Sequence, residues 1–94
     1  VNTGLEQQKA GIEPEKLSEF MDTIRRFMGL NIIGLMCIPP INEAPETHFR
    51  LLKKLADENG LLELSMGMSS DYMAAINCGA TFVRVGTAIF GLRQ

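Results

Sequence analysis

The chain has 94 residues, of which 46% are apolar and 21% are charged, and its net charge is −2. This length allows one small domain, and the composition is ordinary for a globular protein. The slightly acidic balance offers no basic surface, so we expect neither nucleic acid nor a membrane as a partner. No apolar run approaches the roughly 20 residues that span a bilayer.

The N-terminus and the two cysteines bear on the origin of the chain. Residues Val1–Gly4 resemble the end of a strand and lack the features of a signal peptide, so we expect a piece of a longer protein. Cys37 and Cys78 lie far apart and fit no zinc or redox spacing. We therefore expect no metal site, and two buried free thiols in the reducing cytoplasm.

The first half of the chain predicts a helix, a strand and a second helix. Pro14 suits a first helical turn, and apolar residues then recur at helical spacing as far as Met28, before Gly29. Residues Asn31–Ile38 are nearly all apolar without alternation, which is typical of a strand buried on both faces of a parallel sheet. A second amphipathic helix is predicted over Glu46–Asn59.

The second half continues this alternation. We predict strands over Leu61–Ser65 and Thr81–Val85, separated by a tight turn at Met66–Ser69 and a short helix over Ser70–Cys78. A last helical piece is predicted over Ala88–Leu92. Short connections between alternating elements favour a parallel sheet with right-handed crossovers.

Counting the strand end at the N-terminus, the chain contains about four strand–helix units, which suit half of a barrel or a small open sheet. An open sheet needs guarded edges, and no lysine or proline lies within Ile32–Ile38 or Phe82–Val85. We therefore predict an α/β fold, the C-terminal half of a parallel (β/α)8 TIM-type barrel. Residues 1–94 would be a partial barrel domain that lacks its N-terminal half. Its open edges lead us to expect the missing half as a partner, or self-association.

Two turns that follow strands are candidates for a phosphate site, because ligands bind at the C-terminal face of such barrels. In the first, Gly67 lets the backbone approach a ligand, while Ser69 or Ser70 can cap the next helix and offer a hydroxyl. In the second, Gly86 and Thr87 expose backbone N–H groups at a helix start. The alternative is a pair of ordinary helix caps.

Arg84 interrupts the apolar strand Phe82–Val85, and by alternation we expect it to point inward at the mouth of the barrel. A guanidinium there needs an acceptor because it cannot lose its charge. A buried structural salt bridge is the alternative to a ligand. His48, the only histidine, is predicted to face solvent at the start of the second helix, without a catalytic role.

Two blocks of the sequence closely resemble the YggS/PROSC family of pyridoxal-phosphate homeostasis proteins. They are Leu64–Ile76, which contains S-M-G-M-S, and Gly79–Gly91, which contains R-V-G-T-A-I-F-G. Residues Gly34–Pro40 and Val1–Ile12 fit the same family, so the resemblance covers the whole chain. It implies a fold like the N-terminal barrel of bacterial alanine racemases, with pyridoxal 5'-phosphate (PLP) as the cofactor.

The resemblance also assigns residues to PLP. It implies that Ser69, the backbone of Gly86 and Thr87, and the Thr87 hydroxyl hold the phosphate. Arg84 is similar to the arginine that donates to the pyridine nitrogen, which leaves this nitrogen unprotonated and the ring a weaker electron sink. Met66 resembles a family position that lines the cofactor site.

Two further residues, Met36 and Lys9, each have a structural interpretation beside the one that the resemblance implies. Met36 is expected near the cofactor, although a methionine in a barrel is more often core. Lys9 stands where the racemases have a basic residue, although a solvated loop lysine is the commoner case. The Schiff-base lysine of the family lies on an earlier strand, and Lys16, Lys53 and Lys54 fall on polar helix faces. We therefore expect phosphate and ring contacts from this chain but no Schiff-base lysine.

The function implied by the resemblance is PLP binding for intracellular vitamin B6 homeostasis in the cytoplasm, without catalysis. The sequence contains no complete catalytic set. Two alternatives stay open: a fragment of a PLP-dependent, alanine racemase-like enzyme, and a barrel that binds another phosphorylated metabolite.

Overall fold

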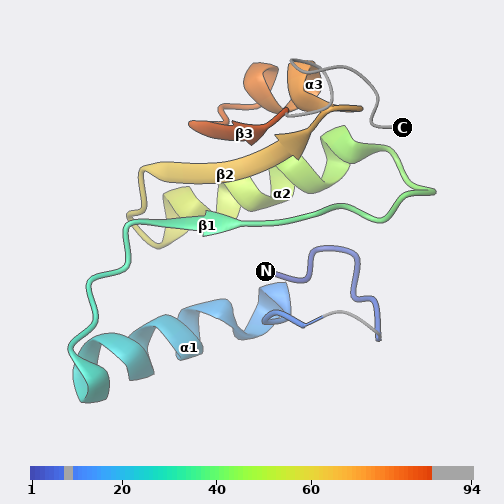
Figure 1. Cartoon of the computed structure of the whole chain (residues 1–94). Coiled ribbons are helices and arrows are strands. Elements are labelled where there is room, and N and C mark those ends of the chain that lie inside the picture. Colours follow the sequence, from blue (N-terminus) through green and yellow to red (C-terminus); the bar gives the residue numbers. More distant parts are fainter. Residues whose placement is uncertain (8–9, 86–94) are drawn as a thin grey trace.

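The computed structural model describes residues 1–7 and 10–85. Three short strands, β1 (Gly34–Met36), β2 (Glu63–Met68) and β3 (Phe82–Arg84), form one parallel sheet in that order (Figure 1). The crossovers between them contain α2 (Pro45–Glu58) and α3 (Tyr72–Asn77). The predicted α/β fold with a parallel sheet is confirmed.

A longer helical segment precedes the sheet. A 3-10 turn, η1 (Pro14–Lys16), leads into α1 (Leu17–Thr23), which continues as a π-helical end, η2 (Ile24–Met28). The helix predicted between Pro14 and Met28 is therefore confirmed, although in three parts. Among the described residues, no helix is both long enough and apolar enough to cross a membrane.

The strands differ in length from the predicted ones. Within the apolar run Asn31–Ile38 the strand covers Gly34–Met36, and β2 extends to Met68 through the predicted turn. The opening residues form no strand, but the Val1 ammonium donates to the Met36 carbonyl at 2.8 Å. The helical piece predicted over Ala88–Leu92 lies outside the described residues.

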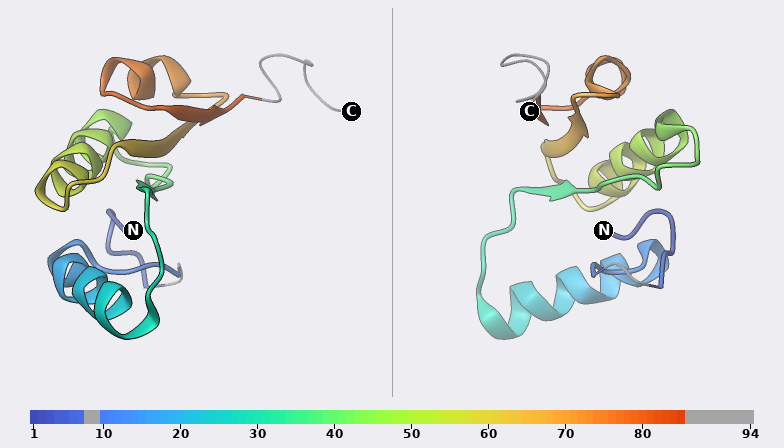
Figure 2. Two further views of the ribbon diagram at one scale, coloured as in Figure 1. Left: turned by 90° about the vertical axis from the view of Figure 1, so that its left-hand side faces the viewer. Right: turned by 45° about the vertical axis from the view of Figure 1, so that its right-hand side comes forward.

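The described helices all lie on one side of the strands, as Figure 2 shows. Alternate strand residues, among them Leu35 and Leu64, therefore face the helices and are buried in one core. The helices contribute the other large members of this core: Leu17, Met21, Phe49, Leu52 and Leu55.

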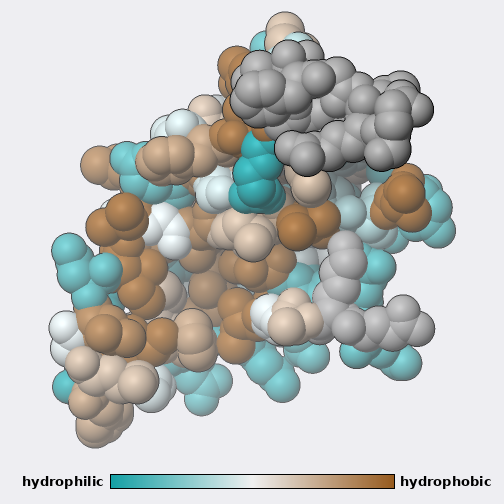
Figure 3. All heavy atoms as spheres, viewed as in Figure 1, coloured by the Kyte–Doolittle hydropathy of each residue, from teal (hydrophilic) through white to brown (hydrophobic). Residues whose placement is uncertain are grey.

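The opposite face of the sheet carries none of the described helices. On it, Met36 and Phe82 keep 47% and 57% of their surface exposed. Figure 3 shows that apolar side chains gather across the middle of this side of the molecule. We call it the helix-free face.

β2 contains a bulge close to the start of α3. Its register with β3 shifts between Ser65 and Met68. Ser65 pairs with Phe82 and Met68 pairs with Arg84, so this segment of β2 contains one more residue than the paired segment of β3. Gly67 lies inside the bulge with a φ of +103°, and a Cβ added there would come within 2.7 Å of the Ala75 Cβ in α3. A bulge changes the direction of the side chains that follow it in the strand. This bulge depends on Gly67, which has no side chain.

We predict that Gly67→Ala lowers the free energy of unfolding by about 2 kcal/mol or more, because left-handed backbone costs an ordinary residue about 1–2 kcal/mol and the new methyl must also displace α3. Urea unfolding followed by circular dichroism measures the loss. Gly60→Ala is the matched control, since Gly60 has a φ of +69° but no atom within 4 Å of an added Cβ. Equal losses in the two variants would contradict the packing role of Gly67.

Candidate functional site

The C-terminal ends of the strands bring candidate residues together. Because β1, β2 and β3 are parallel neighbours, the residues that follow them share one edge of the sheet. Met68 at the end of β2 pairs with Arg84 at the end of β3. Cys37, directly after β1, lies close enough to Arg84 and Asp71 for their charges to affect its pKa. These residues form one cluster.

Arg84 reaches toward β2 on the helix-free face. Its Nη1 donates to the Ser65 Oγ at 2.7 Å. Ser65 pairs with Met36 in the register between β1 and β2, so Ser65 and Arg84 share the helix-free face with Met36. The Arg84 Nη2 is buried and has no hydrogen-bond partner among the described residues. Within that part of the chain, no carboxylate forms the structural salt bridge considered as the alternative.

Ser69 lies in the turn that joins β2 to α3. The Met68 N–H donates to the Asp71 Oδ1 at 2.7 Å, and the Asp71 N–H donates to the Met68 carbonyl at 3.1 Å. The helix begins at Tyr72, with Asp71 as its N-cap residue. The prediction that Ser69 or Ser70 caps this helix is therefore wrong. Both serines lie between the two bonded ends of the turn.

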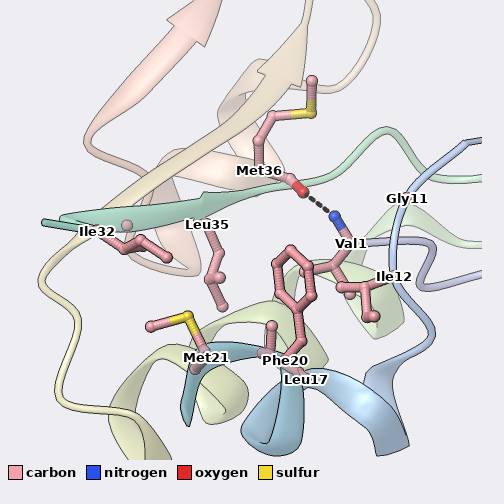
Figure 4. A pocket seen from close by; sticks show the side chains of 10 residues that line it. Val1, Gly11, Ile12, Leu17, Phe20, Met21, Ile32, Leu35 and Met36 are labelled. Carbon is pink, nitrogen blue, oxygen red and sulfur yellow. Dashed lines mark hydrogen bonds between the residues drawn. The ribbon is translucent and has the colours of Figure 1, made fainter. Parts of the chain in front are cut away.

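The two methionines named by sequence analysis face opposite sides of the sheet. Met66 is fully buried in the core on the helical side. Met36 pairs with Ser65, and Figure 4 shows its side chain directed away from that of Leu35. Met66 thus packs the core, while Met36 borders the surface toward which Arg84 points. The contact of Met66 with a cofactor stays a prediction.

A pocket of about 620 Å³ adjoins the turn, between Met68 and Asp71 on one side and the prolines after β1 on the other. Its size suits a small molecule. However, Glu6, Glu43 and Asp71 all line it, and three carboxylates would repel a phosphate. The pocket is therefore a poor site for a phosphate.

Three residues named by sequence analysis, Lys9, Gly86 and Thr87, lie outside the described residues. Their contacts with a cofactor stay predictions.

His48 is placed differently from its prediction. It is buried rather than solvent-facing, and its Nε2 is bonded to the Glu43 carboxylate at 2.9 Å. His48 lies one helical turn before Leu52, which puts it on the apolar side of α2. It lies outside the cluster around Arg84.

The Cys37 thiol lies on the helical side of the sheet, in the core. The thiol is free and only 1% exposed. Burial raises its pKa, against the opposing charges of the Val1 ammonium and Arg84, so the thiol stays neutral at ordinary pH. Cys78 is also free but only partly buried, so the prediction of two buried thiols holds fully for Cys37 alone.

The family model of the alanine racemase N-terminal domain matches residues 1–94. The chain belongs to this family. Among its curated relatives, the pyridoxal phosphate homeostasis proteins of Aquifex aeolicus and Pseudomonas aeruginosa are 45% and 46% identical over all of this chain. The match covers 45% and 43% of those proteins, so the chain spans less than half of their length.

Solved structures of PipY from Synechococcus elongatus agree with this assignment. The structure without PLP matches 96% of the chain at 34% identity with a TM-score of 0.82. The structure with PLP bound matches 97% at 33% identity with a TM-score of 0.74. The chain covers 47% of PipY in each case. The family resemblance predicted from the two turn motifs is confirmed.

The roles of Ser65 and Asp71 were not predicted from the sequence. Ser65 had a usable signal, since it is a polar residue that alternates with buried Leu64 and Met66 and so had to share a face with other inward residues. Asp71 had a weaker signal, because an aspartate often accepts a bond from a nearby backbone N–H in a turn. Neither signal identifies its partner without the register and the bulge.

We predict that Ellman's reagent labels Cys78 well before Cys37, because burial both blocks Cys37 and keeps it protonated. Absorbance at pH 8 measures the rates in two matched variants, each with one cysteine left. Cys78→Ser should react slowly and Cys37→Ser quickly. Equal rates under native conditions would show that Cys37 is not buried.

Proposed function

We propose that this chain is the cofactor-binding part of a protein that holds PLP for vitamin B6 homeostasis and does not itself catalyse a reaction. The observation that supports this most is the Arg84 guanidinium, which has one nitrogen bonded to Ser65 and another buried without a partner among the described residues. A buried charged donor without an acceptor is costly, so the site favours a ligand that supplies one. The pyridine nitrogen of PLP is such an acceptor.

Arg84 would also determine the protonation of that nitrogen. Ser65 fixes one arm of the planar guanidinium, which directs the other arm. Because arginine keeps its proton, the ring nitrogen would accept a hydrogen bond rather than carry a proton. Bound PLP supplies an aldehyde and an electron-withdrawing ring, and the ring withdraws electrons less well when unprotonated. This supports binding without catalysis.

We place the PLP phosphate at Ser69, with the backbone of Gly86 and the backbone and hydroxyl of Thr87. Ser69 follows Met68, the residue that pairs with Arg84, so the turn and the guanidinium share one edge of the sheet. Gly86 follows β3 in the sequence, and turns after neighbouring parallel strands lie side by side. Met66 is the core residue beneath this edge.

We further propose that the chain supplies no Schiff-base lysine. Lys16, Lys53 and Lys54 are exposed on helical segments, and Lys53 is bonded to Asp57 at 2.7 Å. The relatives are more than twice as long, so a lysine from the rest of such a protein would complete the site. We also place the protein in the cytoplasm, where its two cysteines would stay reduced, and cell fractionation is the check.

We predict that the chain binds PLP reversibly and that Arg84→Lys weakens binding roughly 10- to 100-fold, the effect expected for loss of a charged hydrogen bond. Isothermal titration calorimetry measures the affinities. Arg25→Lys is the matched control, because Arg25 donates to the Asn59 carbonyl on the molecular surface. Equal affinities of the two variants would overturn the proposal.

The PLP-bound chain also serves to test for a Schiff-base lysine and for binding of other phosphorylated metabolites. After borohydride treatment, mass spectrometry should find no lysine that is fully modified, and one such lysine would contradict the absent Schiff base. Excess ribose 5-phosphate should not displace PLP. Displacement at comparable concentrations would favour a barrel that binds phosphorylated metabolites in general.

We also propose that the sheet is the C-terminal half of an eight-stranded barrel, with another strand along the free edge of β1. The Val1 ammonium already meets the Met36 carbonyl on that edge. Beside it, a pocket of about 560 Å³ separates α1 from β1 (Figure 4). A strand parallel to β1 would pair with the edge and place alternate side chains in the pocket. The pocket is lined mainly by apolar residues: Ile12, Leu17, Phe20, Met21, Ile32 and Leu35.

We predict that the isolated chain self-associates, because the free edge and the helix-free face leave apolar surface uncovered. Size-exclusion chromatography with light scattering measures the mass. Met36→Lys, on the helix-free face, should shift the chain toward monomer. Leu62→Lys should not, although Leu62, just before β2, is 84% exposed. A compact wild-type monomer with cooperative unfolding would contradict the half-barrel.

A further inference from the structure

The turn between β2 and α3 is closed by a side chain that the proposed function leaves unused. The Asp71 Oδ1 accepts from the Met68 N–H at 2.7 Å, while the Asp71 N–H donates back to the Met68 carbonyl at 3.1 Å. The two bonds join the last residue of β2 to the residue before α3. They enclose only Ser69 and Ser70.

Both ends of this short loop are fixed to the rest of the fold. At one end, Met68 is paired with Arg84, and the preceding Gly67 lies so close to α3 that an added Cβ would come within 2.7 Å of the Ala75 Cβ. At the other end, the Asp71 carbonyl accepts the Ala75 N–H, a helical bond of α3. The position of the Ser69 hydroxyl relative to Arg84 therefore depends on the link between Met68 and Asp71.

We propose that Asp71 is a positioning residue of the phosphate site, which holds Ser69 where its hydroxyl can meet the PLP phosphate. This inference rests on the proposed function. Asp71 touches no part of the cofactor in it. The carboxylate acts through the Met68 N–H, and that N–H is therefore not among the donors to the phosphate.

The charge of Asp71 and its hydrogen bond to Met68 have opposite effects on phosphate binding. A carboxylate near a phosphate repels it, so the charge itself opposes binding while the bond to Met68 favours it. An asparagine keeps the acceptor oxygen and removes the charge. Asp71→Asn should therefore bind phosphate as well as the wild type or better, and Asp71→Ala should bind it worse.

The test compares PLP with pyridoxal, which lacks the phosphate, by calorimetry on the 94-residue chain. The measured quantity is the ratio of the two dissociation constants, pyridoxal over PLP. Asp71→Ala should lower this ratio about five- to tenfold, the usual effect of one lost hydrogen bond, and Asp71→Asn should keep it or raise it. General damage to the fold would weaken both ligands and leave the ratio unchanged. Asp57→Ala, an aspartate on the surface of α2, is the matched control.

Two further variants separate this inference from the proposed function. Ser69→Ala should lower the ratio by itself, and adding Asp71→Ala to it should change the ratio no further, because Asp71 acts through Ser69. An unchanged ratio in Ser69→Ala would overturn the phosphate assignment and this inference with it. A lowered ratio in Ser69→Ala with an unchanged ratio in Asp71→Ala would overturn the positioning role alone.

Hydrogen exchange at the Met68 amide gives a readout that needs no ligand. The amide should be protected in the wild type and in Asp71→Asn, and should exchange faster in Asp71→Ala. Equal protection in all three proteins would overturn the role of the Asp71 side chain.

Discussion

The Arg84 guanidinium is the constraint on which the site depends. Arginine cannot lose its charge, and this one lies at the end of a short strand, half-buried beside an apolar neighbour. Ser65 satisfies one nitrogen only because β2 and β3 pair in the observed register. A slip of one residue would turn Ser65 toward the helices and leave the charge without that partner. The register of the sheet and the chemistry of the site are therefore set by the same contact.

The bulge in β2 connects this contact to the turn beyond it. Without the extra residue at Gly67, the alternation of β2 would continue and the chain would leave the sheet on a different face. The close packing of Gly67 on α3 keeps the bulge in place, and the bonds between Met68 and Asp71 close the loop that follows. The bulge and the two bonds between Met68 and Asp71 thus orient the loop that carries Ser69 and Ser70.

Most of the architecture could be predicted from patterns that act locally. Apolar residues at helical spacing predicted the helices, and a continuous apolar run predicted the strand that contains Leu35. The alternating order of strands and helices predicted the parallel sheet. The ends of the strands were not predicted correctly, because they are set by pairing with the neighbouring strand and not by the composition of the segment. His48 was misplaced because a polar residue on an apolar helical side can be buried when a carboxylate such as Glu43 meets it. At the site, Arg84 could be identified from the sequence because it is a charged residue in an apolar strand. Its partner Ser65 could be identified only once the register of the strands was known.

The two faces of the sheet separate the core residues from the residues of the proposed ligand site. Leu64 and Met66 face the helices and are almost fully buried, so substitutions there act on the whole fold. Ser65 and Arg84 face the other way, where they contribute little packing and one donor that has no acceptor within residues 1–7 and 10–85. A ligand that accepts from this donor would remove a cost already present in the folded chain, so its binding would be coupled to folding. The coupling acts through the β2–β3 register, which the core residues on the opposite face hold in place.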